Sequence, residues 1–161
     1  MSAETETLSF DGGFLRRGFW IYVWQVMAPG ERELYYVGRT GDSSSCNAQS
    51  PFNRMGQHLG FAKNSNMLRK YLAIRGVEPN DCKFRLVAHG PILDEAENLQ
   101  THQERRDRVA GIEKALAEAM GVASYDVMNT VKCRKALDAS MFADVQAAFA
   151  LEFPRLQVDT E

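Results

Sequence analysis

Cysteine is scarce in this sequence. The chain of 161 residues contains three cysteines, Cys46, Cys82 and Cys133, an odd number without any CxxC spacing. Such a set argues against a disulfide framework and against a structural zinc site. We therefore expect a protein that works in a reducing, cytoplasmic compartment.

Long apolar runs are missing as well. Residues 1–10 are polar and acidic, and no stretch stays apolar over the roughly 20 residues that a helix needs to cross a bilayer. The sequence therefore predicts neither a secretory leader nor contact with a membrane. It also lacks a glycine-rich phosphate loop, a nucleophile elbow and an HExxH motif, so those classes of site are not expected.

No charge of one sign dominates the chain, but the charges are unevenly distributed. The formal net charge is −2, yet residues 11–90 contain eleven Lys or Arg against six Asp or Glu. Residues 91–161 reverse this balance, with eight basic against thirteen acidic residues. A basic region beside an acidic one is compatible with a face that binds phosphate. The ordinary composition predicts one folded domain over 13–161, after a flexible lead-in of residues 1–12.

Turn and cap signals divide the chain into strands and helices. The aromatic and β-branched residues of 19–27 and 33–39 predict two strands, and the Pro-Gly turn between them predicts an antiparallel hairpin. Ser50 followed by Pro51 predicts the start of a helix. The order of elements predicts an α+β fold, a small antiparallel sheet covered by helices. The remaining expected elements are helices over 51–59, 66–75, 94–120 and 138–153, a strand over 83–88 and an extended segment over 126–131.

Four residues in and after the hairpin suggest chemistry on phosphate. Tyr22 ends the tripeptide WIY on the first strand, and Tyr36 begins the tripeptide YVG on the second. In the following helix Arg54 and His58 are four residues apart and therefore share one face. A guanidinium is planar, permanently charged and able to hold two phosphate oxygens at once. Arg39, directly after YVG, is a further candidate for a phosphate contact.

The longest predicted helix carries several acidic residues, which helical phase separates. Glu113 comes four residues after Val109 and three before Leu116, so it lies on or beside the apolar stripe that should face the core. A carboxylate at such an edge needs a partner, either a metal ion or an arginine such as Arg54. Glu118 points toward the solvated side and is the second candidate for a metal ligand.

This ordered set of residues, over 18–130, resembles the GIY-YIG nuclease superfamily. The two tripeptides resemble the motifs that name the family, with Trp20 in place of the usual glycine and a longer interval between the tyrosines. Asn129 resembles the asparagine that follows the family's catalytic helix, and its distance along the chain fits Glu118 better than Glu113. The resemblance implies a three-stranded antiparallel sheet flanked by helices, here with an additional C-terminal helix.

The resemblance also implies an activity, that of a divalent-metal-dependent endonuclease that hydrolyses DNA phosphodiester bonds as a monomer or homodimer. A phenol has an ordinary pKa of about 10, so a tyrosine that activates water needs cations nearby. Mg²⁺ keeps most of its waters, and one carboxylate can hold it. The implied roles are activation of water by Tyr22, contact with water or phosphate by Tyr36, transition-state stabilisation by Arg54, proton movement or phosphate contact by His58, substrate binding by Arg39 and Asn129, and binding of Mg²⁺ or Mn²⁺ by Glu113.

Two alternatives from other functional classes stay open. A domain of this fold could bind nucleic acid without cutting it, and it would then show salt-dependent DNA binding without metal-dependent cleavage. A structural or protein-interaction domain, whose tyrosines are only core residues, would not bind DNA even at low salt.

Overall fold

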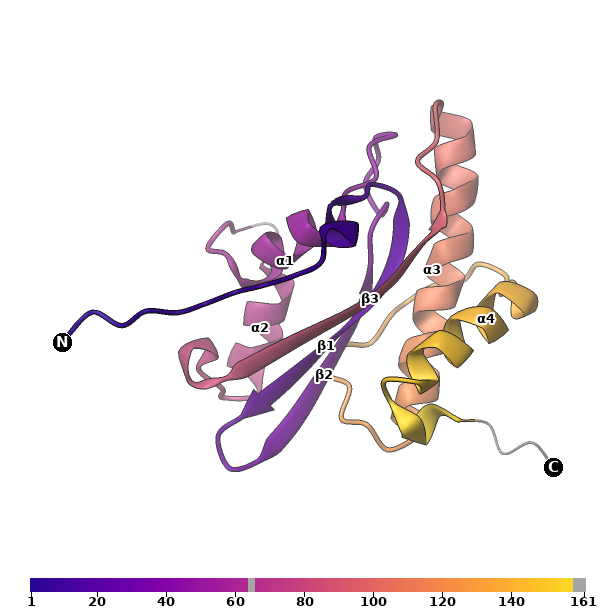
Figure 1. Cartoon of the computed structure of the whole chain (residues 1–161). Coiled ribbons are helices and arrows are strands. Elements are labelled where there is room, and N and C mark those ends of the chain that lie inside the picture. Colours follow the sequence, from indigo (N-terminus) through magenta and orange to yellow (C-terminus); the bar gives the residue numbers. More distant parts are fainter. Residues whose placement is uncertain (64–65, 158–161) are drawn as a thin grey trace.

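The computed structural model describes residues 1–63 and 66–157. Its centre is a three-stranded antiparallel sheet in the order β2-β1-β3 (Figure 1). Strand β1 spans Phe19–Ala28, β2 spans Arg32–Arg39 and β3 spans Lys83–Leu93. The expected α+β class, with a three-stranded antiparallel sheet flanked by helices, is confirmed.

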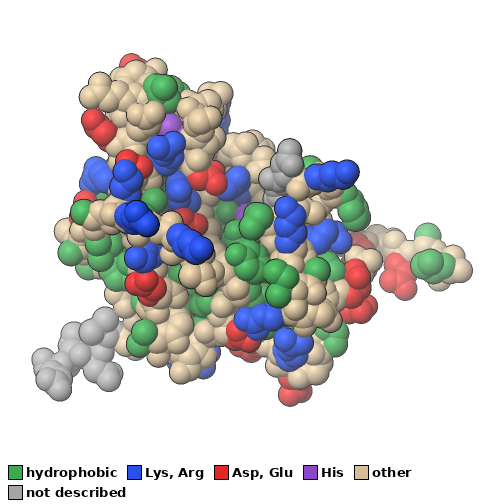
Figure 2. All heavy atoms as spheres, turned by 180° about the vertical axis from the view of Figure 1, so that it is seen from behind, with side chains coloured by type: hydrophobic (Ala, Val, Ile, Leu, Met, Phe, Trp, Pro, Cys, Tyr) green, Lys and Arg blue, Asp and Glu red, His purple; other side chains and the backbone are tan. Residues whose placement is uncertain are grey.

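Helices cover both faces of this sheet (Figure 1). On one face lie α1 (Pro51–Leu59) and α2 (Met67–Ile74), and on the other lie α3 (Leu99–Val122) and α4 (Ala139–Ala150). Seen from behind, the half of the molecule that contains α3 displays many Lys and Arg side chains (Figure 2). Three short 3-10 turns complete the described elements: η1 (Gly12–Leu15), η2 (Pro79–Asp81) and η3 (Pro154–Leu156).

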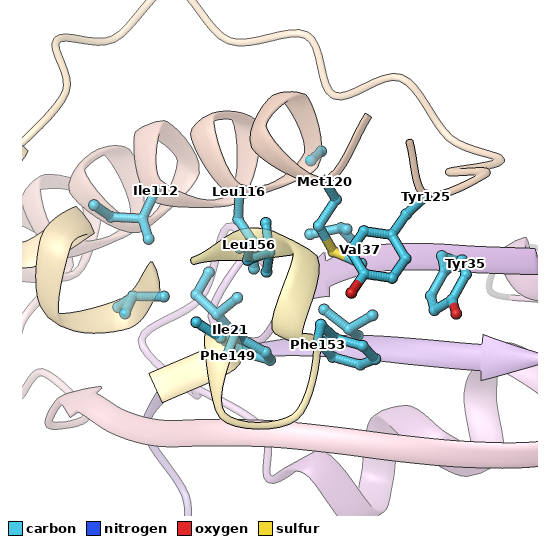
Figure 3. Close-up of a cluster of buried hydrophobic side chains, with 14 of the residues drawn as sticks. Ile21, Tyr35, Val37, Ile112, Leu116, Met120, Tyr125, Phe149, Phe153 and Leu156 are labelled. Atoms are coloured by element: carbon cyan, nitrogen blue, oxygen red, sulfur yellow. The ribbon is translucent and has the colours of Figure 1, made fainter. Parts of the chain in front are cut away.

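The two layers follow from the alternation of side chains along β1. Successive residues of a strand point to opposite faces of the sheet, and β1 is buried along most of its length. Ile21 and Val23 therefore face α3 and α4, whereas Tyr22 and Trp24 face α1 and α2. The apolar cluster on the α3 side, drawn in Figure 3, includes Ile21, Val37, Ile112, Leu116, Met120 and Phe149.

Capping residues determine where the helices begin. Ser50 caps α1, since its side chain accepts a hydrogen bond from the backbone N–H of Asn53, and Pro51 is tolerated next because its nitrogen needs no partner there. Asn98 caps α3 in the same way. This cap starts α3 at Leu99, whereas the sequence pattern predicts a start near residue 94.

The free edge of β2 is covered by the segment that follows α3. The backbone N–H of Tyr35 donates to the carbonyl of Asp126 at 2.9 Å, and that of Met128 donates to the carbonyl of Tyr35 at 2.7 Å. Val127 and Tyr35 form a parallel bridge. The extended segment expected over 126–131 is therefore reduced to this bridge, which protects an edge that would otherwise be open to pairing.

The N-terminal residues 1–11 form no helix or strand and are exposed. The ring of Phe10 packs against Phe52 of α1, with 5.1 Å between the ring centroids. No helix in the described part of the chain combines the length and the apolar character that crossing a bilayer requires.

Candidate active site

Tyr22 and His58 meet in the interior between β1 and α1. The Tyr22 hydroxyl lies 2.5 Å from Nε2 of His58, a short hydrogen bond. Both side chains are buried, with 2% and 3% of their surfaces exposed. Nδ1 of His58 is also buried and has no hydrogen-bond partner within residues 1–63 and 66–157. The structure thus joins two predicted site residues into a buried, titratable pair.

Burial dominates the protonation of this pair. It raises the pKa of Tyr22 well above its ordinary value, although the positive charge of Arg54 acts in the opposite direction. Burial, together with the charge of Arg54, lowers the pKa of His58 to about 4. Both residues are therefore uncharged at neutral pH. The guanidinium of Arg54 supplies the positive charge expected beside Tyr22. Its lowering of the pKa of the phenol is smaller than the rise that burial causes.

Arg54 is fixed next to this pair by three contacts. Its Nη2 donates to Oδ2 of Asp42 at 2.6 Å and to the backbone carbonyl of Arg39 at 3.4 Å. Its Nη1 donates to Oε1 of Gln57 at 3.1 Å. The Nε of Arg54 is buried without a hydrogen-bond partner among the described residues. The guanidinium is thus held in one orientation and keeps a donor for another group.

Asp42 is a member of this site that the sequence reasoning missed. Its negative charge acts in the upward direction on the pKa values of Tyr22, His58 and Glu113. Its position in a loop rich in serine gave no pattern of its own. One signal could have singled it out, because Asp42 is the only acidic residue between positions 34 and 77.

Glu113 of α3 faces the end of β2, where it is paired with an arginine. Nε of Arg39 donates to Oε2 of Glu113 at 2.8 Å, and the two side chains are 16% and 15% exposed. The arginine partner of this carboxylate is therefore Arg39, not Arg54. Burial raises the pKa of Glu113, and the charge of Arg39 opposes that rise. Glu118, the other candidate, is exposed and lies 3.8 Å from Lys114.

The surroundings of Glu113 fit a cation that is held by few protein ligands. Oε2 is bonded to Arg39, but Oε1 has no hydrogen-bond partner in the part of the chain that the structure describes. No group of three His, Cys, Asp or Glu side chains placed to bind a metal occurs among those residues. Mg²⁺ usually keeps several waters and binds through one or two carboxylates. Glu113 offers one carboxylate of this kind, and the charge of Asp42 adds to the negative potential around it.

Tyr36 lies on the same sheet face as Tyr22. Its ring centroid is 4.9 Å from that of His58, in an edge-to-face arrangement, and only 8% of the residue is exposed. Burial raises the pKa of Tyr36, and the neighbouring phenol of Tyr22 adds to the rise. Tyr36 is therefore a neutral phenol beside the imidazole.

Asn129 lies at the free edge of β2, where its amide is bonded at both ends. Its Oδ1 accepts a hydrogen bond from the backbone N–H of Val37 at 3.0 Å, and its Nδ2 donates to the carbonyl of Val37 at 2.7 Å. Asn129 thus braces the strand that carries Tyr36. Its expected contact with a substrate stays a prediction.

The predicted residues therefore fall into two adjoining groups. Tyr22, Tyr36, Arg54 and His58 are gathered between the sheet and α1, whereas Arg39 and Glu113 form a pair between the end of β2 and α3. The charges of Arg54 and Glu113 both act on the pKa values of the two tyrosines, so the groups are electrostatically coupled. No protein-family model, curated protein or solved structure matches the chain. The GIY-YIG resemblance accordingly rests on the residues themselves.

Proposed function

We propose that this protein is a GIY-YIG-type endonuclease that hydrolyses DNA phosphodiester bonds with the help of a divalent cation. The observation that carries the proposal is the buried hydrogen bond between Tyr22 and His58, with the fixed guanidinium of Arg54 beside it. Buried polar groups in proteins are normally paired. Here Nδ1 of His58 and Nε of Arg54 are buried without partners among the described residues, a pattern more typical of a reactive site than of a packing core.

Tyr22 and His58 together can accept the proton of an attacking water. As the water oxygen bonds to phosphorus, its proton passes to the Tyr22 oxygen, and Tyr22 passes its own proton to Nε2 of His58. The bond from phosphorus to the leaving oxygen breaks, and that oxygen takes a proton from solvent. DNA brings negative charge close to Arg54, which offsets the positive charge that helps to lower the pKa of His58. Protonation of the imidazole is therefore easier in the complex than in the free protein.

Arg54 supplies positive charge to the phosphoryl oxygens as negative charge builds up on them. Its orientation is set before substrate arrives, because Asp42 and Gln57 hold its two terminal nitrogens. Such preorganisation is the main source of electrostatic stabilisation in enzyme sites. Tyr36, packed against His58, is in position to hold the water or a phosphate oxygen.

Glu113 would hold Mg²⁺ or Mn²⁺ through Oε1 while Oε2 remains bonded to Arg39. When bound, the cation neutralises charge on the phosphate and on the leaving oxygen. Arg39 serves this arrangement in two ways. It orients the carboxylate, and its buried Nη1, which has no partner among the described residues, can donate to a phosphate oxygen.

Cleavage of supercoiled plasmid DNA tests the proposal. The wild-type protein is expected to nick or linearise plasmid in Mg²⁺ or Mn²⁺ and to be inactive in EDTA. Arg54→Ala and Tyr22→Phe should each lower the rate by about a hundredfold or more. The matched control is Arg75→Ala, which breaks the Arg75–Asp126 ion pair of 2.8 Å at the end of α2 and should keep the wild-type rate.

Four results would contradict this proposal in whole or in part. Undiminished cleavage by Tyr22→Phe would show that Tyr22 takes no part in activating the water. Wild-type rates in EDTA would show that cleavage needs no divalent cation. DNA binding without cleavage over several substrates would support a binding module that does not cut. Absence of DNA binding at low salt would support a structural or protein-interaction domain.

A further inference from the structure

The segment between Asn129 and Asp138 is tied to the body of the protein at both ends. Asn129 is bonded to β2, as described above, and Nη2 of Arg108 donates to Oδ2 of Asp138 at 2.8 Å. Between these points, Nζ of Lys114 donates to the carbonyl of Cys133 at 3.2 Å. The segment therefore runs along α3 in a defined position, although it contains no helix or strand.

A glycine on α3 lets this segment lie close to the helix. A Cβ built on Gly111 would come within 3.1 Å of the carbonyl oxygen of Ala136. Such a contact is tighter than ordinary van der Waals packing, so a larger residue at this position would push the segment away. The segment is thus packed against α3 along its length.

Its outward side chains are basic. Lys132 and Arg134 are exposed, whereas Val131 and Cys133, which alternate with them along the chain, are half-buried, so the alternation places both cations on the solvent side. Neither Lys132 nor Arg134 has an ion-pair partner among residues 1–63 and 66–157. Lys135 is exposed as well and pairs with Asp107 at 3.2 Å.

Two further arginines lie in the N-terminal half of α3, outside this segment. Arg105 donates to the backbone carbonyl of Asp94 and has no carboxylate partner in the described part of the chain. Arg106 lies 3.7 Å from Asp107. Figure 2 shows Lys and Arg side chains on this half of the face, interspersed with Asp and Glu side chains. The basic strip, as we define it, consists of Lys132, Arg134 and Lys135 of the segment between Asn129 and Asp138.

The basic strip begins where the candidate active site ends. Asn129, which braces β2 beside Tyr36, precedes Lys132 by three residues. Lys114, which anchors Cys133, is the residue next to Glu113. A duplex whose scissile phosphate lies at Tyr22 and Glu113 would thus bring neighbouring phosphates toward the strip.

We infer that the basic strip binds the phosphate backbone of duplex DNA on one side of the cleaved bond, an inference that rests on the proposed function. Exposed lysine and arginine side chains without carboxylate partners, such as Lys132 and Arg134, bind phosphate well, because DNA binding releases the counterions condensed on the duplex. Contacts of this kind position the duplex and carry no sequence information. The strip therefore sets the orientation of DNA on the enzyme and not the choice of target sequence.

The salt dependence of DNA binding tests the inference separately from cleavage. Binding of a short fluorescein-labelled duplex of mixed sequence is measured by anisotropy in EDTA at several salt concentrations. Each lost phosphate contact should reduce the slope of log K against log salt by about 0.9. Lys132→Gln and Arg134→Gln should each show this change and the double variant about twice as much. Lys132→Arg should restore the wild-type slope.

Lys83→Gln is the matched control. Lys83 is exposed at the start of β3 and has no ion-pair partner in the described residues, so this variant removes the same charge away from the strip. Its slope should equal that of the wild type. An unchanged slope in the Lys132→Gln/Arg134→Gln double variant, or an equal change in Lys83→Gln, would overturn the inference and leave the proposed function standing.

Cleavage with enzyme in large excess over plasmid distinguishes the two claims. The double variant should cut at the wild-type rate once the DNA is saturated, because the basic strip lies outside the reacting groups. If the wild-type protein binds DNA but never cuts it, and the Lys132 and Arg134 variants still show reduced salt slopes, the DNA-binding role of the basic strip would be supported. The proposed nuclease activity would be overturned. A wild-type protein that binds no duplex at low salt would overturn both.

Discussion

The ring of Tyr22 lies directly against the backbone of Gly38, its partner in the antiparallel register of β1 and β2. A Cβ at position 38 would come within 2.5 Å of the Tyr22 ring and of its hydroxyl oxygen. Any side chain at this position would therefore displace the phenol from His58. The glycine that ends the tripeptide YVG is thus explained by the space that Tyr22 occupies.

Gly38→Ala is accordingly expected to damage the candidate active site as well as the fold. Forcing a methyl group into a packed interior costs about 1–3 kcal/mol of unfolding free energy, measurable by urea denaturation. Cleavage should fall further than this loss explains, because the Tyr22–His58 hydrogen bond is broken. Gly121→Ala is the control, since a Cβ added to Gly121 of α3 would meet no atom within 4 Å, and alanine there should stabilise the helix by up to about 1 kcal/mol. Wild-type stability and activity in Gly38→Ala would contradict the packing argument.

The sequence alone predicted most of the elements because their signals are local. The aromatic runs, the Pro-Gly turn and the Ser50 cap each act over a few residues, and the hairpin and α1 follow from them. Strand β3 is longer than the 83–88 expected, since it continues to Leu93 through Gly90-Pro91, a pair that usually marks a turn. Its pairing with β1, which reaches from Met27 to Phe19, outweighs that local signal.

The candidate site was predicted less completely, because its contacts join distant parts of the chain. Helical spacing predicted that Arg54 and His58 share one face of α1. Helix phase favoured Glu113 over Glu118 as the carboxylate near the core, and Glu118 is exposed in the structure. The partner of Arg54 is Asp42, which comes from a loop without a recognisable pattern. The proximity of Asp42 to Arg54 depends on how this loop packs beside α1, which no local sequence pattern indicates.

Binding of Mn²⁺ should depend on Glu113 and not on Glu118. Glu113→Gln removes the charge but keeps the size of the side chain, so the folded protein should lose the rise in Tm that Mn²⁺ produces in the wild type. Cleavage should be lost with it. Glu118→Gln, an exposed position on the same helix, should keep both responses. The reverse pattern would assign the cation to Glu118, as the distance to Asn129 along the sequence suggested.

Buried His58 should make the folded protein sensitive to acid. Its pKa is lowered to about 4, so the unfolded chain takes up a proton as the pH falls below about 6.5 while the folded protein does not. This difference favours unfolding by about 1.4 kcal/mol per pH unit between these two values. In His58→Gln the loss of unfolding free energy between pH 7 and pH 5 should be smaller by about 2 kcal/mol. Urea denaturation at several pH values measures it, and equal losses in both proteins would place His58 in contact with solvent.

Asn129 offers a test that separates bracing of β2 from binding of substrate. Asn129→Ala leaves the N–H and carbonyl of Val37 without their partners, which should cost about 1–3 kcal/mol of unfolding free energy. Asn129→Asp keeps the acceptor for the Val37 N–H but sets a carboxylate oxygen against the Val37 carbonyl, so it should also lose stability at neutral pH. Asn80→Ala, at an exposed asparagine in η2, should leave stability unchanged. Because both ends of the Asn129 amide are bonded to β2, the affinity of Asn129→Ala for uncut DNA in EDTA should equal that of the wild type under conditions where both are folded. A weaker affinity with unchanged stability would assign Asn129 to the substrate instead.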